Sequence, residues 1–504
     1  MRRRSSCQFE TEQDATHGRS ITVGWWKASV KDRAVDPPNV AKPTAPKYRE
    51  DGLVKSKNAG MGRIATLASV SLIAVACSST AVSPSSASPS TAPPSTAPSA
   101  SAAAVSPSPA KPESLTFWGS QETPQAVKDT IDAFGKQEGI KTEFVVLPAD
   151  QGIVLTKIAT GDKSDVIFWQ SSVSGLLPLN PEKNLLDLSD MAVAGKLKYG
   201  MGELAGKVNG KVYAALFGFP TVFGVFYNKK VFADNGLTPP STHQELLDVS
   251  AKLKAAGVPP MFLAEGDVWP NQLPVFEIRT DAIADGLIQK INNREATWTD
   301  PAIVDSFRIW KEYVDQGFLN PNYKTAKFTD SHTALLDGKT GMVAQGSWFT
   351  PGLVEAADGS SEKVDEAIGF FPWPSESGKL QWQASNLGSV QLFKTGDAAR
   401  EAAARRFVDY ITGDGYQGYL DSAKEAPILD GFQTPPLSKL TTDFVNAFET
   451  GSVPSEGMLQ AVGTGDLPSW ISQLQAGTLT PEQVAQNMQD AFEKNAKEAG
   501  IPGY

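Results

Sequence analysis

Cysteine and histidine are scarce in this chain of 504 residues, which holds two Cys and three His. Cys7 and Cys77 both precede residue 114, where we expect the folded domain to begin, so no disulfide framework is expected inside that domain. Only His243 and His332 lie within it, which nearly excludes a zinc or copper site built from histidines. We therefore predict no metal, no cofactor and a fold that depends on its hydrophobic core.

Positive charge is also in short supply, with 46 Lys and Arg against 56 Asp and Glu, a formal net charge of -10. This balance argues against nucleic acid as a partner, because phosphate binding is driven by Lys and Arg. The chain has no G-x-S-x-G nucleophile motif. "GDGYQG" at 413–418 matches G-x-G-x-x-G, but it follows the helical "AAARRFVDYIT" rather than a strand, and no helix clearly opens from it. We predict neither a dinucleotide site nor an enzyme.

A short apolar run stands in place of a membrane-spanning segment. Residues 64–76 form an apolar run of 13 residues, whereas a spanning helix needs roughly 20. Three basic residues precede the run and small residues end it, so residues 54–76 are typical of a signal peptide. The end of the run resembles the bacterial lipobox, although Ala74 replaces the usual leucine. We expect Cys77 to carry lipid and to anchor the protein on the extracytoplasmic face of the cell membrane; a plain secretory signal is the alternative.

The segments on either side of this signal lack apolar bulk. Residues 77–113 are almost entirely Ser, Ala and Pro, which predicts a disordered and rather extended tether. Residues 1–53 place an unusually long polar extension before a signal peptide. We interpret them as an untranslated or disordered upstream extension, with the true start near Val54.

Residues 114–504 have the pattern of an α/β domain. "SLTFWGS" at 114–120, "KTEFVVLP" at 141–148 and "KSDVIFWQSS" at 163–172 read as strands, separated by helical stretches. Thr123 is a candidate N-cap for the first helix, and Thr242 with Glu245 forms a capping box for a later one. Strands that alternate with helices predict mainly parallel sheets, in which ligands bind where strands end in loops.

The order of these segments resembles family 1 extracellular solute-binding proteins, the sugar-binding components of bacterial ABC importers. The resemblance covers residues 114–504 and rests on "LTFW" at 115–118, "SDVIFW" at 164–169, "VNGKVYAALFGFP" at 208–220, "FYNKKVFADNGLTPPSTHQELLDVSAKLKAAG" at 226–257, "LLDGKTGMVAQGSW" at 335–348, "GFFPWP" at 369–374 and "GTLTPEQVAQNM" near the end.

This resemblance implies a two-lobed periplasmic-binding-protein fold, with the ligand in the cleft between the lobes. We expect a first lobe at about 114–222 and 374–428, and a second at about 223–372 and 429–504. The chain would cross between the lobes near residues 221–225, 371–374 and 426–431. Ligand would stabilise a hinge closure by contacting both lobes. The implied partners are a carbohydrate and the permease subunits of an ABC importer, and we expect a monomer.

A carbohydrate presents apolar C–H faces, which favour aromatic rings, and hydroxyl groups, which favour carboxylates and amides. Trp348 is the first candidate, because the resemblance places its segment in the cleft. Trp310, by contrast, falls at helical core spacing. The predicted ligand-binding residues are Trp348, Trp269, Asp267, Glu265, Asn271, Trp118, Ser120, Gln121, Glu122, Trp169, Gln170, Trp373, Trp382 and Asn386.

Three alternatives remain open at this point. The ligand could be another polar solute, such as a polyol, a glycerol phosphodiester or a peptide. The protein could be a surface glycosidase, because plentiful carboxylates leave a catalytic pair possible. It could also bind sugar as a sensor or adhesion subunit without feeding a transporter.

Overall fold

The structure is a computed structural model that describes residues 111–148 and 151–504. The predicted upstream extension, the signal peptide, Cys77 and nearly all of the tether therefore lie outside the described residues. Within the described ranges, no helix is both long enough and apolar enough to cross a membrane.

The first sheet has the strand order β2-β1-β3-β11-β6. β1 runs parallel to β2 and β3, while β11 runs antiparallel to β3 and β6. β4 and β5 form a short separate hairpin that precedes β6 in the chain. These strands are β1 (Ser114–Gly119), β2 (Lys141–Val146), β3 (Val166–Phe168), β4 (Lys207–Val208), β5 (Lys211–Val212), β6 (Ala215–Leu216) and β11 (Ser389–Leu392).

The second sheet has the order β12-β10-β7-β8, and β9 also pairs with β7. β8, β9 and β10 all run antiparallel to β7, whereas β12 runs parallel to β10. These strands are β7 (Thr221–Asn228), β8 (Met342–Gly346), β9 (Ile368–Phe371), β10 (Leu380–Gln383) and β12 (Ser452–Pro454).

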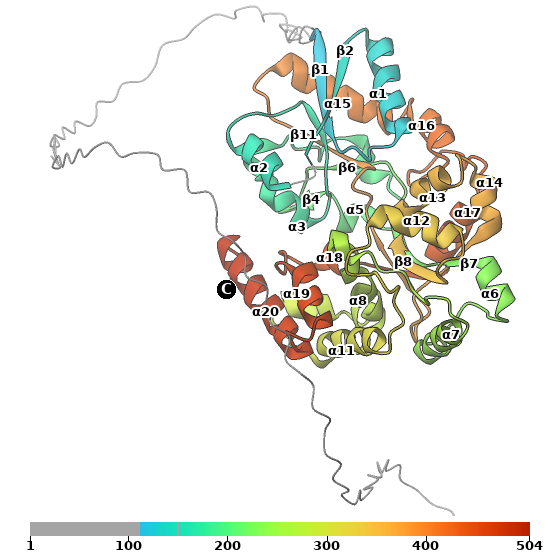
Figure 1. Cartoon of the computed structure of the whole chain (residues 1–504). Helices are drawn as coiled ribbons and strands as arrows, with labels where there is room; N and C mark the ends of the chain where they lie inside the picture. Colours follow the sequence, from blue (N-terminus) through green and yellow to red (C-terminus); the bar gives the residue numbers. More distant parts are fainter. Residues whose placement is uncertain (1–110, 149–150) are drawn as a thin grey trace, which may run out of the picture. The chain divides into compact units, whose positions relative to one another are not determined.

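The α/β class and the two lobes are as predicted (Figure 1). Both sheets are mixed, however, whereas we expected mainly parallel sheets. The physical reason lies in how the strands are connected. β7 enters the second sheet directly from the first, and β11 returns in the same way. Neither strand follows a helical crossover within its own sheet, and that crossover is what makes neighbouring strands parallel.

The sheets define where the chain passes between lobes. It leaves the first sheet after Leu216 and enters the second at Thr221, slightly before the expected 221–225. The segment 371–374, where we expected the second crossing, instead joins β9 to β10 within the second sheet. The return crossing lies later, between Gln383 and Ser389. The third lies between α16 and α17, over residues 424–438, and contains the expected 426–431.

Helices cover both sheets. In the first lobe, α1, α15 and α16 pack together beside β1 and β2. The helices of this lobe are α1 (Gln125–Glu138), α2 (Gln151–Ala159), α3 (Val173–Leu176), η1 (Leu177–Leu179), α4 (Pro181–Asn184), η2 (Ala192–Gly195), α5 (Met201–Leu204), α15 (Ala398–Ile411) and α16 (Tyr416–Ala423).

In the second lobe, α17 packs on β9, β10 and β12, while α8 packs on β8 and contacts α11. The helices of this lobe are α6 (Lys229–Asp234), α7 (His243–Ala255), η3 (Glu265–Asp267), η4 (Trp269–Gln272), α8 (Leu273–Ile278), α9 (Thr280–Ala284), α10 (Leu287–Asn292), α11 (Pro301–Asp315), α12 (Phe328–Leu336), η5 (Ser347–Phe349), α13 (Thr350–Ala356), α14 (Ser361–Ala367), α17 (Lys439–Thr450), α18 (Glu456–Leu459), α19 (Leu467–Gln475) and α20 (Pro481–Glu498).

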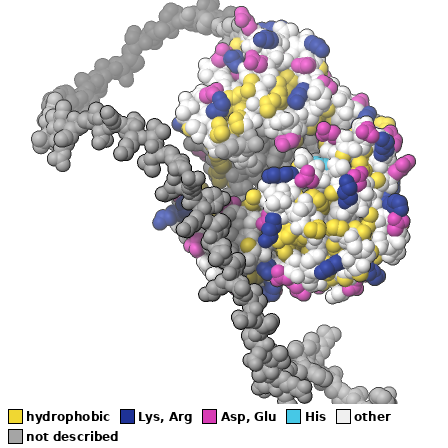
Figure 2. All heavy atoms as spheres, viewed as in Figure 1, with side chains coloured by type: hydrophobic (Ala, Val, Ile, Leu, Met, Phe, Trp, Pro, Cys, Tyr) yellow, Lys and Arg dark blue, Asp and Glu magenta, His cyan; other side chains and the backbone are white. Residues whose placement is uncertain are grey.

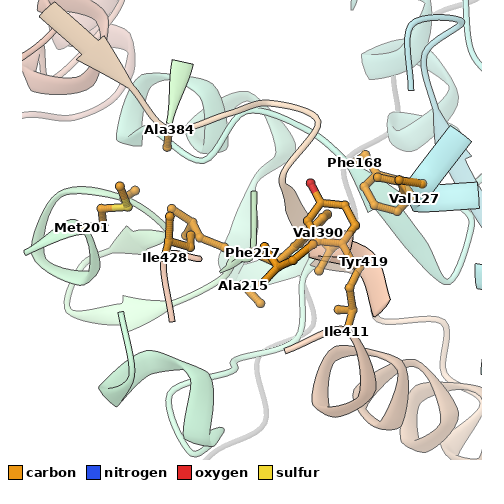
Figure 3. Close-up of a cluster of buried hydrophobic side chains, with 14 of the residues drawn as sticks. Val127, Phe168, Met201, Ala215, Phe217, Ala384, Val390, Ile411, Tyr419 and Ile428 are labelled. Carbon is orange, nitrogen blue, oxygen red and sulfur yellow. The ribbon is translucent and has the colours of Figure 1, made fainter. Parts of the chain in front are cut away.

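The largest apolar cluster runs through both lobes. It includes Phe117 in β1, Phe226 in β7 and Phe444 in α17. Side chains near the crossings also belong to it, among them Phe217 and Tyr419 (Figure 3). Because this core is continuous across the crossings, the hinge region is packed rather than loosely connected.

Candidate functional site

In the first sheet, the strand ends nearest the crossings lead into several predicted site residues. Leu216 at the end of β6 pairs with Ser389 at the start of β11, and the next residue of β11 pairs with Phe168 at the end of β3. β1 runs parallel to β3, so the loops after both strands lie at this same end of the sheet. The predicted residues in these loops are Ser120, Gln121, Glu122 and Gln170.

The second sheet presents Trp348 at its corresponding end. Gly346, the last residue of β8, pairs with Phe223 near the start of β7, just after the first crossing. Trp348 follows in η5, where Ser347 accepts a hydrogen bond through its hydroxyl from the backbone N–H of Val222 at 3.3 Å. The register of β7 and β8 therefore holds Trp348 at the end of the second sheet that borders the first lobe.

Aromatic rings form a connected group at this end. The half-buried Trp348 ring lies 5.4 Å from that of Phe223 at 87°, and 6.2 Å from that of Trp269 at 62°. Trp269 in turn lies 5.1 Å from Phe328 at the start of α12. The Trp348 indole N–H donates to Gln345 Oε1 at 3.0 Å, which fixes the orientation of the ring. The structure thus brings Trp269 and Trp348 together, although their segments are far apart in the chain.

The loop that carries Trp269 is held tightly against α12 and the turn before it. A side chain on Gly266 would bring its Cβ to 2.6 Å from the carbonyl oxygen of Ala326, so only glycine fits there. The Asp267 carboxylate accepts from the backbone N–H of Phe328 at 2.7 Å and from Lys327 Nζ at 2.9 Å. Val268 adopts a φ of +63°, rare for a β-branched residue, and the residue is 41% exposed.

The pKa values of the two carboxylates in this loop are shifted in opposite directions. Burial raises the pKa of Glu265, and only Ser472 and Lys324 oppose that effect. Burial also acts to raise the pKa of Asp267, but the N–H of Phe328 and the Lys327 ammonium outweigh it, so the pKa of Asp267 is lowered. Asp267 is therefore held more firmly in its ionised form, and Glu265 is the more easily protonated of the two.

The polar residues after β1 differ in exposure. Gln121 and Glu122 are exposed, while Ser120 is half-buried and its hydroxyl has no hydrogen-bond partner. After β3, Gln170 is half-buried, and the neighbouring Ser171 hydroxyl is buried without a partner. Sequence reasoning did not single out Ser171, although its place directly after Gln170 was a usable signal. Unpaired buried hydroxyls beside a strand end are candidates for a polar ligand.

Trp118 and Trp169 lie in the core of the first lobe. Trp118 is 4% exposed, with its ring 6.2 Å from Phe393 and the ammonium of Lys157 5.4 Å above it. Trp169 is 9% exposed and its indole N–H donates to the carbonyl of Gly175 at 3.0 Å. Both rings pack against neighbouring elements of their own lobe.

The remaining predicted residues are scattered. Asn271 is fully buried and donates to the carbonyl of Pro468 and the hydroxyl of Ser472, while Trp373 is buried in the second large apolar cluster. Asn386 is exposed in the second crossing. Trp382 is buried with its ring 5.8 Å from that of Phe448.

Trp382 also borders a hollow between the lobes. This hollow has a volume of about 450 Å³ and is lined by Tyr199, Leu204, Trp382, Phe448, Glu449, Gly451, Ser452 and Pro454. The Tyr199 hydroxyl donates to Glu449 Oε1 at 2.9 Å, which links the lobes. Burial, together with Glu449, raises the pKa of Tyr199 to about 12. A second link runs from the Ser174 hydroxyl in α3 to the carbonyl of Gly457 in α18 at 3.3 Å.

Acidic and basic side chains are interspersed over the face shown in Figure 2, with apolar patches on both lobes. No cluster of three or more His, Cys, Asp or Glu capable of holding a metal ion occurs in the part of the chain that the structure describes.

The described chain thus has two α/β lobes joined by three crossings, with an aromatic group at the border between the lobes. The family of bacterial extracellular solute-binding proteins matches residues 118–418, and the chain belongs to that family. This confirms the predicted family and fold class.

Individual relatives agree with this assignment. The "Multiple sugar-binding protein" of Streptococcus mutans is 26% identical over 351 residues, which cover 66% of this chain and 80% of that protein. A solved "Chitin oligosaccharide binding protein" superimposes with a TM-score of 0.65 at 21% identity, over 76% of this chain and 99% of its own. A raffinose complex of the solute-binding protein RafE superimposes with a TM-score of 0.59 at 20% identity, over 76% and 99%. These structures share the fold.

Proposed function

We propose that the protein captures a carbohydrate between its two lobes and delivers it to the permease of an ABC importer, without chemical change to the sugar. The observation that carries this proposal is the aromatic group of Trp348, Trp269 and Phe223 at the end of the second sheet. Flat rings suit the C–H faces of a sugar, and the loops of the first sheet offer polar groups opposite. The names of the relatives support the same ligand class.

Within this site we assign roles by exposure and charge. Trp348 and Trp269 are the stacking platform, and Asp267 with Glu265 accepts hydrogen bonds from sugar hydroxyls. Ser120, Gln121, Glu122 and Gln170 contact the sugar from the first lobe. Asn386 and Trp382 border the second crossing and the hollow. The buried Trp118, Trp169, Trp373 and Asn271 hold the surrounding structure in place and contribute indirectly.

We also propose how the protein reaches its place of work. Residues 54–76 direct export, Cys77 receives lipid, and residues 77–113 tether a monomeric binding domain at the extracytoplasmic face of the cell membrane. Residues 1–53 are absent from the mature protein. The folded domain divides into a first lobe around β1 to β6 and β11, and a second lobe around β7 to β10 and β12. Mass spectrometry of the mature protein tests the anchor, and a lipid-modified N-terminal Cys77 is expected. Mass mapping of the precursor tests the proposed start near Val54, which a peptide from residues 10–50 would overturn.

The ligand class is tested by thermal denaturation of the purified chain against maltose, raffinose, chitin and xylan oligosaccharides, polyols, glycerol phosphodiesters and peptides. A ligand that binds only the folded state raises the Tm by mass action. The proposal expects a rise with a carbohydrate and recovery of that carbohydrate unchanged. A rise only with a peptide or phosphodiester would overturn the sugar and keep the class of protein. Release of product from a chromogenic glycoside would favour a glycosidase.

A further inference from the structure

Side chains at α16 join two of the three crossings between the lobes. The first crossing consists of residues 217–220, between β6 and β7, and the third begins after Ala423, where α16 ends. α16 lies within and just after the "GDGYQG" motif and packs against α1 and α15 of the first lobe. The motif, for which we predict no dinucleotide, therefore places Tyr416 at the hinge, and the residue that follows it adds Tyr419.

Tyr416 makes the first connection. Its hydroxyl donates to the backbone carbonyl of Phe217 at 2.7 Å and accepts from the backbone N–H of Ile428 at 3.1 Å. The side chain is fully buried, so both bonds are shielded from water. One hydroxyl group thus holds a residue of the first crossing against a residue of the third.

Glu425 makes the second connection. Its Oε2 accepts from the backbone N–H of Phe219 at 3.0 Å and from the Tyr419 hydroxyl at 2.9 Å. Tyr419 is buried, and its ring lies 5.1 Å from that of Phe217. Both side chains belong to the cluster in Figure 3. Burial raises the pKa of Glu425, while the N–H of Phe219 and the Tyr419 hydroxyl oppose that effect. Both hydrogen bonds therefore favour the charged carboxylate, and they attach the peptide group of Phe219 to it.

The second crossing packs directly on the first. A Cβ on Gly218 would lie 2.6 Å from the Cα of Gly388, so the two backbones touch. All three crossings therefore form one bundle beside α16. Within it, Phe219 is followed by Pro220, whose φ is fixed by its ring, and then by β7. The Phe219 ring also lies 5.5 Å from Phe448 of α17 in the second lobe.

A hinge closure is absorbed by φ and ψ changes at a few residues of the crossings. Hydrogen bonds hold the peptide groups of Phe217 and Phe219 in place, and so restrict rotation about the neighbouring φ and ψ bonds of the first crossing. We propose that Tyr416 and Glu425 are positioning residues that set the angle between the lobes, and thereby the fraction of molecules ready to close on a solute. This inference rests on the proposed capture between lobes, and is independent of which solute is bound.

The test measures the distance between the lobes without any ligand. Spin labels are attached through Lys136→Cys on α1 and Lys252→Cys on α7, both exposed positions, in the full chain carrying Cys7→Ser and Cys77→Ser. Double electron–electron resonance then gives the distribution of distances between the labels. Glu425→Leu, Glu425→Gln and Tyr416→Phe are compared with the parent chain.

The matched control is Glu401→Leu. Glu401 Oε1 also accepts two backbone N–H groups, those of Thr395 and Gly396, both at 2.8 Å, but entirely within the first lobe. Its loss should lower the Tm and leave the distance distribution unchanged. Any effect of Glu425→Leu on that distribution is then attributable to the crossings rather than to general destabilisation.

We expect Glu425→Leu and Tyr416→Phe each to shift or broaden the distribution, and Glu425→Gln to keep it, because an amide oxygen still accepts from Phe219. Distributions identical to the parent in both Glu425→Leu and Tyr416→Phe would overturn the inference. Should Glu425→Leu fail to fold, Tyr416→Phe, which keeps its ring, decides. A shifted distribution in a chain that binds no carbohydrate would leave this inference standing and would overturn the proposed ligand alone.

Discussion

Trp348 and Trp269 meet with their ring centroids 6.2 Å apart, one at the end of β8 and the other in a loop clamped against α12. Each ring also has a second aromatic neighbour, Phe223 and Phe328 respectively. Four rings from four segments therefore support one another, and the two indoles keep part of their surface free. Such preorganised rings lose little conformational entropy when a ligand stacks on them.

Replacing Trp348 with alanine should weaken carbohydrate binding by about 1 kcal/mol or more, roughly fivefold in Kd, because stacking area is lost. The fold should remain, because this side chain is only half-buried. Isothermal titration calorimetry gives the affinity and thermal denaturation gives the stability.

The control for Trp348 is Trp310, which is fully buried, as its helical spacing predicted. Trp310→Ala should cost about 3–5 kcal/mol of stability through the cavity it leaves, with little effect on affinity in the molecules that stay folded. An unchanged affinity together with a collapse of stability in Trp348→Ala would make Trp348 a core residue and remove it from the site.

Glu277 in α8 predicts a pH-dependent loss of stability. Its side chain is 1% exposed, its Oε1 has no hydrogen-bond partner, and burial raises its pKa well above the ordinary 4.5, against the opposing effect of the Trp373 N–H. Above pH 4.5 the unfolded carboxyl group has released its proton while the folded one retains it, so stability falls as pH rises.

The variant Glu277→Gln removes this titration and preserves the shape. Its stability relative to the parent should increase from about the unfolded pKa upward and level off above the folded pKa. Urea denaturation at a series of pH values from acid to mildly alkaline measures the difference. A constant difference across that series would show that the pKa of Glu277 is the same in the folded and unfolded states, contrary to the prediction.

Local sequence signals predicted helix ends well where a side chain bonds a backbone N–H group a few residues away. The predicted capping box of Thr242 with Glu245 forms. The structure adds a second capping box, of Thr480 with Gln483, and Gly139 ends α1 in a left-handed conformation. Thr123, however, does not cap α1: the helix starts at Gln125, Pro124 is its N-cap residue, and the Thr123 hydroxyl has no hydrogen-bond partner. The "GDGYQG" motif does lead into a helix, α16, contrary to our expectation.

Burial of the candidate site residues was harder to predict, because a continuous apolar strand gives no sign of which face a side chain takes. "VIFW" at 166–169 has no alternation, so Trp169 could not be assigned to the core or to a surface. Pairings between distant segments, such as Trp269 with Trp348 or Glu425 with Phe219, depend on strand register and loop path. A single sequence does not determine either of these.

Arg279 and Glu456 form an ion pair that is almost completely removed from water, with the side chains 0% and 2% exposed. Arg279 also donates to the Ser306 hydroxyl at 2.8 Å and stacks over Phe307 at 4.6 Å. Glu456→Ala leaves the guanidinium buried without its partner and should cost about 3–5 kcal/mol of stability.

The double variant Arg279→Met with Glu456→Met should recover most of that loss, because two apolar side chains of similar length need no desolvation. Urea denaturation of the parent, Arg279→Met, Glu456→Met and the double variant completes a double-mutant cycle. If the double variant were as unstable as Glu456→Ala, the pair would contribute net stability, and the expected recovery would be wrong.

Gly266 provides the sharpest steric test of the loop that carries Asp267 and Trp269. A methyl group there meets the carbonyl oxygens of Ala326 and Thr325 at 2.6 and 2.7 Å, so Gly266→Ala must push the loop away from the segment before α12. We expect a loss of about 1–3 kcal/mol in stability, together with weaker carbohydrate binding as the Asp267 contacts lengthen. Gly463→Ala is the matched control, because a Cβ there meets no atom within 4 Å. Equal affinities in the two variants would show that this loop does not shape the binding site, whereas weakening confined to Gly266→Ala ties the placement of Asp267 and Trp269 to ligand capture.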